Sequence, residues 1–352
     1  MPRAEWMQQF IDHILAGKAI EPILVDIGAS GGSPKIWQPI RAHSTYVGFD
    51  GDDRDIRHPQ QHEFRHAHFV HEVITPNGDH EVRFYLTRSP YCCSTLRPNT
   101  LVTENFLSAD SFIVESERSV RASNLNGVLD RLSLERIDWL KIDTQGTDLR
   151  IYASLRQELR DRLLAIDAEP GLRGAYVGED LFCDLHRRLV TDGFWLSNLK
   201  VCGLVRMRKT TLDELAKRDP TLAGQPGADA IARALRPTPG WTECRYLRSL
   251  ESLAKLSGTD QGGRRDYLLL WVFAMIDKQY GFGVDLALEY ARRFGPDDDS
   301  AMMERESLAR IAEARVAAEG AAEAAARAKR PVQVTLFGRV KRKVRRVLSL
   351  GR

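Results

Sequence analysis

The sequence predicts an α/β protein with a Rossmann-like fold, in which a mostly parallel seven-stranded sheet carries helices on both faces and a helical extension follows at the C-terminus. Three observations lead to this expectation. Short apolar runs alternate with amphipathic stretches over about the first two hundred residues, which is typical of a doubly wound sheet. The first of these runs, ILVDI, ends at a glycine-rich turn. Beyond about residue 210, apolar residues recur at helical spacing.

The order of elements follows from these patterns. An amphipathic helix is expected at the start of the chain. The acidic residues among its apolar positions distinguish it from a signal peptide. Buried strands are expected where a short apolar run precedes a turn, and helices where apolar residues recur three or four positions apart. The expected strands lie at 23–27, 46–49, 64–74, 81–87, 137–142, 163–168 and, as two short strands, within 194–208; the expected helices lie at 34–42, 122–136, 147–162 and 179–192.

The chain is expected to divide into four segments. Residues 1–209 form the α/β domain, and residues 210–296 form a helical subdomain, in which stretches such as RYLRSLESLAKL are interpreted as helices. Residues 297–330 are rich in Ala, Glu and Arg and predict one long helix, which suits either self-association through 301–329 or a passive spacer. Residues 331–352 form a basic tail after Pro331.

Charge and cysteine content restrict the class of protein. The net charge is +3, which gives no support for a specific nucleic-acid partner, and the last fourteen residues hold seven Arg or Lys and no acid. Segment 336–352 is interpreted either as a basic amphipathic helix on an anionic membrane surface or as a disordered end. Five cysteines without CxxC spacing predict free thiols and a cytoplasmic location, at the inner membrane surface if the tail binds it. No metal site is predicted, since His66 and His68 are interpreted as a polar strand face.

The glycine-rich turn after the first strand has the sequence DIGASGG at 26–32. Glycine lets the backbone turn sharply and approach a ligand closely, so Gly28, Ser30 and Gly32 are candidate cofactor-binding residues. Asp26 would disfavour a pyrophosphate and suit a ligand with an ammonium group, such as S-adenosylmethionine. The alternative for Asp26 is a structural carboxylate bonded to the turn.

Two further acidic residues stand at the ends of predicted strands. Asp50 ends the second strand, where a carboxylate can accept hydrogen bonds from both hydroxyls of a ribose; the alternative is a solvated turn. Lys141 and Asp143 punctuate an otherwise apolar strand, and a buried charge must be paired or belong to a site. Asp143 is therefore a candidate cofactor-binding residue, with helix capping as the alternative. Because the carboxyl ends of parallel strands share one edge, Asp26, Asp50 and Asp143 are expected to converge on one crevice.

At these residues the sequence resembles the FkbM family of methyltransferases. The resemblance is carried by LVDIGASGG, YVGFDGD and above all IDWLKIDTQGTDLRIYASL, and it covers about residues 20–205. A family strand that ends in Glu corresponds to LLAIDAEP and places Glu169 at the matching position, and FYLTRSPYCCSTLRPN is similar to a Ser-rich stretch of the family. The chain departs at 30–31, where many members have Asn and a bulky residue, and at 144–145, where many have Val-Glu.

The resemblance implies an S-adenosylmethionine-dependent O-methyltransferase acting on a hydroxyl of a sugar, a glycan or a natural-product scaffold. An alcohol must lose its proton during methyl transfer, so Asp143 and Glu169 are the candidate catalytic bases. Gln145 stands where many members carry a carboxylate, which puts an acid/base role at that position in doubt. Two other functions stay open: an NAD- or nucleotide-sugar-binding Rossmann enzyme, and a catalytically inactive methyltransferase-like scaffold module.

Overall fold

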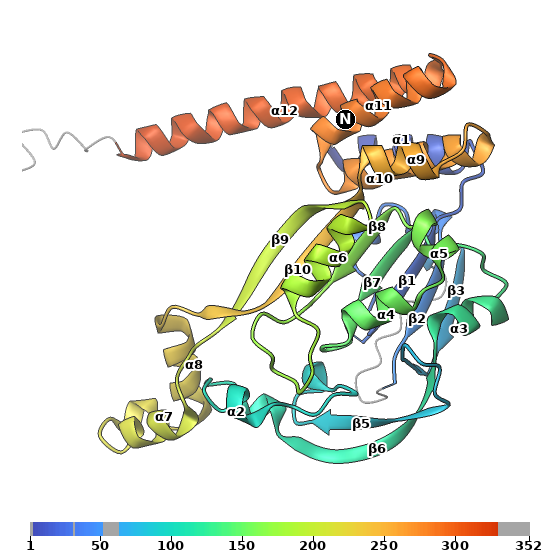
Figure 1. Cartoon of the computed structure of the whole chain (residues 1–352). Helices are drawn as coiled ribbons and strands as arrows, with labels where there is room; N and C mark the ends of the chain where they lie inside the picture. The colour runs from blue at the N-terminus through green and yellow to red at the C-terminus, as the bar shows by residue number, and fades with distance from the viewer. Residues whose placement is uncertain (1–2, 31, 52–62, 330–352) are drawn as a thin grey trace, which may run out of the picture.

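A central sheet organises the molecule. The computed structural model describes residues 3–30, 32–51 and 63–329, and within these ranges seven strands form this sheet in the order β3-β2-β1-β7-β8-β10-β9 (Figure 1). The interior strands β2, β1, β7 and β8 are short and mostly buried, whereas β3 at one edge is half-exposed and the pair of β10 and β9 at the other end is longer. The strands are β1 (Ile23–Ile27), β2 (Thr45–Phe49), β3 (His66–Val70), β7 (Trp139–Ile142), β8 (Ala165–Ala168), β9 (Phe194–Leu204) and β10 (Thr238–Arg248).

Strand direction confirms the predicted mixed α/β class with a mostly parallel sheet. Strands β3, β2, β1, β7 and β8 pair in parallel, whereas β10 is antiparallel to both β8 and β9. From β1 the chain builds outward through β2 and β3, then returns to the other side of β1 with β7. The strand order therefore reverses between β1 and β7, and in open sheets of this kind a ligand crevice forms at the carboxyl ends of the strands at such a point.

The two faces of the sheet bury different apolar clusters, because side chains alternate along each strand. Leu24 of β1 and Trp139 of β7 face one cluster, and their neighbours Val25 and Leu140 face the other. The second cluster is covered by α3 (Leu125–Arg131), α4 (Asp148–Ser154), α5 (Gln157–Arg162) and α6 (Phe182–Thr191).

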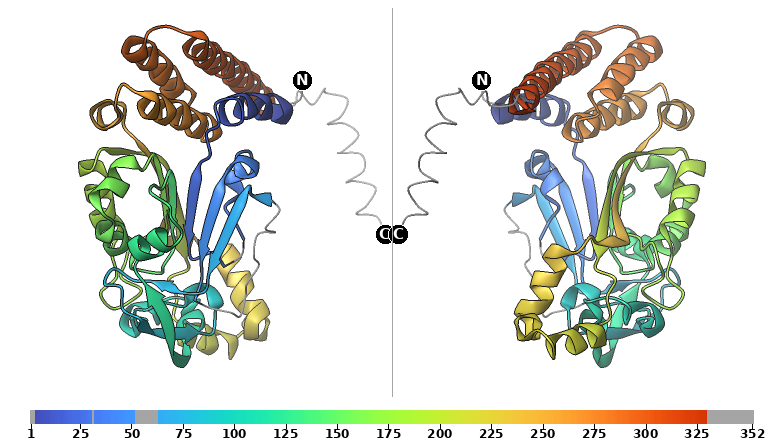
Figure 2. Two further views of the ribbon diagram at one scale, coloured as in Figure 1. Left: turned by 90° about the vertical axis from the view of Figure 1, so that its right-hand side faces the viewer. Right: turned by 90° about the vertical axis from the view of Figure 1, so that its left-hand side faces the viewer.

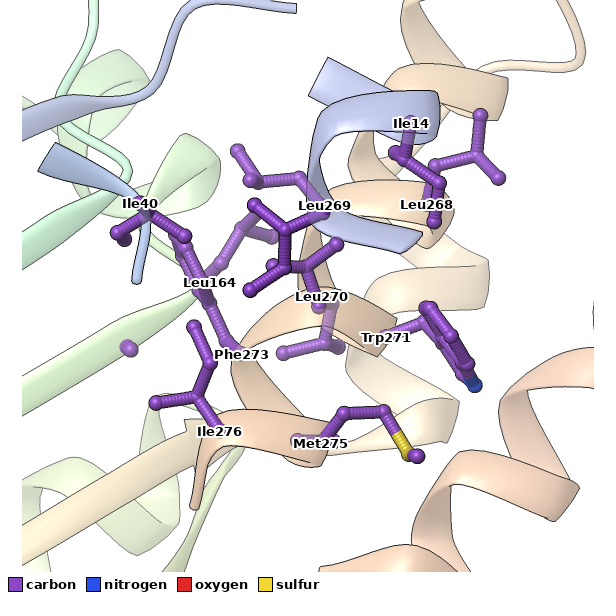
Figure 3. Close-up of a cluster of buried hydrophobic side chains, with 14 of the residues drawn as sticks. Ile14, Ile40, Leu164, Leu268, Leu269, Leu270, Trp271, Phe273, Met275 and Ile276 are labelled. Atoms are coloured by element: carbon purple, nitrogen blue, oxygen red, sulfur yellow. The ribbon is translucent and has the colours of Figure 1, made fainter. Parts of the chain in front are cut away.

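The first cluster is completed by helices from both ends of the chain. Figure 3 shows Ile14 of the N-terminal helix among Leu268, Leu269 and Phe273 of α10. The aromatic residues of α10 are core residues: Tyr267 and Trp271 are almost fully buried. The helices of this layer are α1 (Arg3–Leu15), α9 (Leu250–Leu256), α10 (Gln261–Ile276), α11 (Tyr280–Phe294) and α12 (Asp298–Lys329).

The opposite end of the sheet carries a second, smaller sheet. Its strands β4 (Val73–Ile74), β5 (Glu81–Thr87) and β6 (Val114–Ser123) lie beyond the carboxyl ends of the central strands, together with α2 (Thr100–Thr103) (Figure 1). Helices α7 (Lys209–Ala216) and α8 (Gly224–Ala234) lie at the same end. Figure 2 shows this order from the side, with the helical layer at one end, the central sheet in the middle and these elements at the other.

The predicted helical subdomain at 210–296 needs correction. Strand β10 interrupts it and lies inside the central sheet, and the residues Arg245 to Arg248, predicted as the start of a helix, belong to this strand. Pairing with β8 and β9 and the burial of Tyr246 and Leu247 outweigh the helical propensity of this stretch, which no local pattern reveals. A helix follows only from Leu250, after the side chain of Ser249 caps it.

Smaller differences have local causes. The predicted helix at 34–42 is two 3₁₀ turns, Lys35–Trp37 and Arg41–His43, on either side of Pro39, which lacks a backbone N–H. The predicted helix at 122–136 is shorter, because β6 continues to Ser123 and Asn124 caps the helix that follows. The predicted helix at 147–162 is split between α4 and α5, and the stretch 194–208 holds the single strand β9.

Helix α12 confirms the predicted long helix after the Gly295-Pro296 break. Its first third packs against α11, with Met303 and Ser307 fully buried, and residues 311–325 are exposed as the helix extends beyond the body (Figure 1). In the part of the chain that the structure describes, no helix has the length and apolar character of a membrane span. The basic tail at 331–352 lies outside the described residues.

A buried ion cluster joins the helical layer to the sheet. Asp138, at the start of β7, has no exposed surface; it accepts hydrogen bonds from both Nη atoms of Arg265 at 2.8 Å, from Arg136 at 3.0 Å and from the backbone N–H of Ile23 at 2.8 Å. Burial alone would raise the pKa of Asp138, but these guanidinium groups hold it below its ordinary value.

We expect Asp138→Asn to lower the free energy of unfolding by about 3 kcal/mol, because Arg265 then stays half-buried without its anion. Since the folded-state pKa of Asp138 is lowered, its contribution is complete above the ordinary carboxyl pKa of about 4 and disappears as the pH falls below it. Urea unfolding at neutral and acidic pH measures both effects. Glu117→Gln is the control, since its pair with Arg83 at 3.6 Å is exposed; an equal loss in the two variants would contradict the assignment.

Candidate functional site

A cavity of about 370 Å³ lies at the carboxyl ends of the central strands, beneath the smaller sheet. Strands β1, β2, β7 and β8 each contribute the residues at or just after their last position. Of the residues that the sequence singles out, the cavity brings together Gly28, Ser30, Asp50, Asp143 and Glu169. Its volume lies within the range of ligand-binding pockets.

The glycine turn brings β1 and β7 into close backbone contact. Gly28 has a φ of 84°, and a Cβ atom built on it would lie 2.1 Å from the carbonyl oxygen of Asp143. The backbone N–H of Asp143 in turn donates to the carbonyl oxygen of Ile27 at 2.9 Å. Any side chain at position 28 would therefore push the two strand ends apart, which explains why this position requires glycine.

The β2 end of the cavity combines a carboxylate with apolar walls. Asp50 follows the last residue of β2, and Phe49, Val73, Ile74 and Phe84 line the space around it. Three of these four apolar residues come from the smaller sheet, Val73 and Ile74 from β4 and Phe84 from β5. This end of the cavity therefore suits a flat apolar group joined to a polyol.

Gln145 holds Asp143 in place. Its Nε2 donates to Oδ1 of Asp143 at 2.7 Å, its Oε1 accepts from the hydroxyl of Tyr176 at 3.1 Å, and its carbonyl accepts from the hydroxyl of Ser94 at 2.8 Å. Its φ of 55° is uncommon for a residue other than glycine, and such strain is typical of functional sites. The sequence leaves the role of Gln145 open, and the structure places it beside Asp143 as a positioning residue.

Glu169 is a half-buried carboxylate that lines the cavity, and its side chain has no hydrogen-bonding partner among the described residues. Burial raises its pKa to about 8, and the negative charge of Asp143 adds to this, while Lys141 acts in the opposite direction. A carboxyl group with this pKa exchanges its proton near neutral pH. A cation in the cavity would stabilise the ionised form of Glu169 most.

Asp148 is a site residue that the sequence analysis missed. Its fully buried carboxylate accepts from the hydroxyl of Thr144 at 2.6 Å and from the backbone N–H groups of Thr144 and Glu169, both at 3.2 Å. Burial raises its pKa to about 7. Asp148 thus ties together the residues that follow β7 and β8. In the sequence it stands in the first turn of a helix, where an acidic residue is ordinary.

Two predicted cofactor-binding residues lie away from the cavity. Asp26 is fully buried behind the glycine turn, where its Oδ1 accepts from Nζ of Lys141 at 3.0 Å and its Oδ2 accepts from the hydroxyl of Tyr46 at 3.1 Å. Its partner is therefore a lysine of the protein and not a ligand ammonium. Gly32 does not line the cavity either, since the chain has turned away by that point.

Lys141 connects the buried carboxylate of Asp26 to the cavity. Its Nζ also donates to the carbonyl oxygen of Gly28 at 3.2 Å and lies 3.9 Å from Oδ2 of Asp143. Burial would lower the pKa of Lys141, but Asp26, Asp143 and Glu169 raise it above its ordinary value, so the side chain stays charged. One ammonium group therefore sits among three carboxylates, and the surroundings of the cavity carry an excess of negative charge.

The residues that the structure describes form neither a metal-binding cluster nor an activated thiol at the cavity. Across residues 3–30, 32–51 and 63–329, no set of three or more His, Cys, Asp or Glu side chains is arranged to hold a metal ion. All five cysteines are free, and Cys92 and Cys93 line the cavity. Burial raises the pKa of Cys92 to about 11, so its thiol is not activated.

No protein-family model, no curated protein and no solved structure matches the chain. The function is therefore argued from the residues of the cavity.

We expect Lys141→Met to lower the free energy of unfolding by about 3 kcal/mol at neutral pH, because it leaves Asp26 buried without a countercharge. The deficit should shrink as the pH falls, since a protonated Asp26 needs no partner. Asp143→Asn is the matched variant on the same strand: it faces the cavity, so its stability should change by no more than about 0.5 kcal/mol. Urea unfolding of both variants at two pH values makes the comparison, and equal losses would show that Asp143 is a structural residue.

Proposed function

We propose that the protein is an S-adenosylmethionine-dependent O-methyltransferase that acts on a hydroxyl group of a sugar or a related scaffold. One observation carries the proposal: the Gly28 turn, Asp50, Asp143 and Glu169 line a single cavity at the point where the strand order reverses. The resemblance of the motifs at 20–32, 46–52 and 137–155 to the FkbM family supports the same assignment.

The β2 side of the cavity fits an adenosine group. Asp50 stands at the end of the strand next to the glycine turn, the position from which a carboxylate can accept hydrogen bonds from ribose hydroxyls. Phe49, Val73 and Ile74 supply apolar surface for a base beside it. Several ligands carry a nucleoside, so the β2 side of the cavity does not by itself distinguish among them.

The centre of the cavity fits a cation. Asp143 and Glu169 face the same space, and their mutual repulsion contributes to the raised pKa of Glu169. A ligand with a sulfonium and an ammonium group would relieve this repulsion, whereas the pyrophosphate of a dinucleotide would increase it. The charge of this region therefore favours S-adenosylmethionine over NAD or a nucleotide sugar.

When bound, S-adenosylmethionine supplies a methyl group for in-line displacement by an oxygen nucleophile. Within the chain, the Gln145 and Tyr176 contacts fix the orientation of Asp143, which can accept a hydrogen bond from an acceptor hydroxyl. Glu169, with a pKa of about 8, is the residue that can take the proton of that hydroxyl near neutral pH. The proton moves to the Glu169 carboxylate as the carbon–oxygen bond forms. Both residues named from the sequence as candidate bases thus keep a place at the cavity.

The test of the cofactor is calorimetric titration of the purified chain with S-adenosylmethionine, NAD and a nucleotide sugar. We expect S-adenosylmethionine to bind and the other two not to bind. Asp50→Asn should weaken its binding about tenfold, the equivalent of one hydrogen bond to a charged acceptor. The matched control is Asp110→Asn, a surface carboxylate paired with Lys209 outside the cavity. Binding of NAD in place of S-adenosylmethionine would refute the proposal.

The pH dependence of that binding tests Glu169 separately. Because a cationic ligand binds best when Glu169 is ionised, affinity should rise by up to about tenfold per pH unit from about pH 6 and level off near pH 8. Glu169→Gln should remove this rise and should lower turnover at least about a hundredfold if Glu169 takes the hydroxyl proton. Release of S-adenosylhomocysteine over a panel of sugar acceptors measures turnover. A wild-type profile in the Gln variant would exclude Glu169 from both roles.

A further inference from the structure

A second charged feature of the cavity lies at its opposite end. Arg173 follows β8 in the loop before α6 and lines the cavity, as Gly240 of β10 does. In the order of strands, Asp50 stands at β2 and Arg173 stands beyond β8, so the carboxylates Asp143 and Glu169 lie between them. With about 4.8 Å between neighbouring strands, the ends of β2 and β8 are about 14 Å apart. The two ends of the cavity are therefore separate binding regions.

The guanidinium group of Arg173 is partly buried but lacks hydrogen-bond acceptors. Its Nε and Nη1 atoms are buried, and no atom of the described residues accepts a hydrogen bond from them. Its Cζ lies 3.6 Å from the centre of the Phe106 ring, which supports the flat side of the group. Burial lowers the pKa of Arg173, and Glu179 offsets this only in part. Elsewhere in the fold, buried arginines such as Arg245 and Arg265 are paired with carboxylates.

The Nη2 atom of this guanidinium lies next to a residue without a side chain. A Cβ atom built on Gly240 would lie 3.6 Å from both Nε and Nη2 of Arg173, at ordinary contact distance. Nε is buried, so Nη2 is the nitrogen that can donate a hydrogen bond to a carboxylate or a phosphate in the cavity. Arg206, whose Cζ lies 5.8 Å from the same Phe106 ring, adds a second positive charge at this end.

We propose that Arg173 binds an anionic group, a carboxylate or a phosphate, on the molecule that accepts the methyl group. That the bound molecule is the methyl acceptor rests on the proposed function, but the anion-binding site itself does not. Arg173 does not bind an anionic group of the cofactor, because the proposed cofactor region extends from β2 to β7 and Arg173 lies beyond β8. The acceptor is thus an acidic sugar or a sugar phosphate and not a neutral glycan.

The experiment measures the affinity of the full chain for glucuronic acid, glucose 6-phosphate, neutral glucose and inorganic phosphate, each with S-adenosylhomocysteine present. We expect at least one of the two acidic sugars to bind about tenfold or more tightly than glucose, and more tightly than inorganic phosphate. Which of the two binds identifies the anion as a carboxylate or a phosphate. Equal binding of glucose and both acidic sugars would overturn the proposal, and so would inorganic phosphate binding as tightly as the acidic sugars.

Two variants locate the preference. Arg173→Met removes the charge and keeps an apolar side chain on Phe106, and Gly240→Ala keeps the charge but places a methyl group 3.6 Å from Nη2. Both should abolish the preference for the acidic sugar and leave the affinity for S-adenosylmethionine unchanged within about twofold. The control Arg118→Met, on the exposed face of β6, should keep the preference. A preference that survives in both site variants would refute the assignment.

Thermal unfolding without ligand separates a binding arginine from a structural one. Because Arg173 has buried donors without acceptors, Arg173→Met should not lower the melting temperature, whereas the loss of a structural arginine would lower it. A clear decrease in Arg173→Met, with no such decrease in Arg118→Met, would contradict the proposal. If S-adenosylmethionine does not bind but the acidic sugars still bind through Arg173, the proposed methyltransferase function fails and this site remains.

Discussion

The close contact between the ends of β1 and β7 is the constraint on which the rest of the site depends. Gly28 approaches the Asp143 carbonyl so closely that no side chain fits between them, and the buried Asp26–Lys141 pair lies directly behind this contact. The pair holds the two strands in register and gives the turn a polar backing inside an apolar sheet. Because β1 and β7 are locked together here, Asp50 on one side and Glu169 on the other are brought to the same cavity. A site assembled from four strands thus depends on one glycine and one ion pair.

Charge pairing separates the structural part of the molecule from the part that binds ligands. Three carboxylates that face away from the cavity have cationic partners: Asp26 has Lys141, Asp138 has Arg265, and Asp167 has Arg245 at 2.7 Å. Pairing stops at the cavity, where Glu169 and Arg173 lack partners for their side chains within the described residues. An unpaired buried charge is costly, so its presence in a folded protein calls for a compensating role. The two groups have opposite signs and both follow β8, so under the two proposals each faces a ligand group of the opposite charge.

Local patterns predicted the part of the fold that local patterns determine. Apolar runs that end in Gly28, Asp50 and Asp143 were enough to predict parallel strands with these residues at one edge, and the resemblance added Glu169. Asp26 has the same residue type at nearly the same place but points behind the turn, because its partner Lys141 comes from a strand more than a hundred residues later. Strand β10 is buried through pairing with β8 and β9, although its last four residues, Arg245 to Arg248, were predicted as the start of a helix. Asp148 and Arg173 were missed since their significance lies in what surrounds them.

The two halves of the cavity come from different parts of the chain, and this has a consequence for specificity. The proposed cofactor half uses the turn and strand ends between residues 26 and 51, in the most regular part of the sheet. The proposed acceptor half uses the loop that follows β8 and the antiparallel strand β10. Helices α7 and α8 are inserted between β9 and β10, and Arg208 and Lys209 at the start of this insertion contact Asn105 and Asp110 beside the cavity. Changes in these loops can alter the acceptor without disturbing Gly28 or Asp50, because no strand pairing of the cofactor half passes through them.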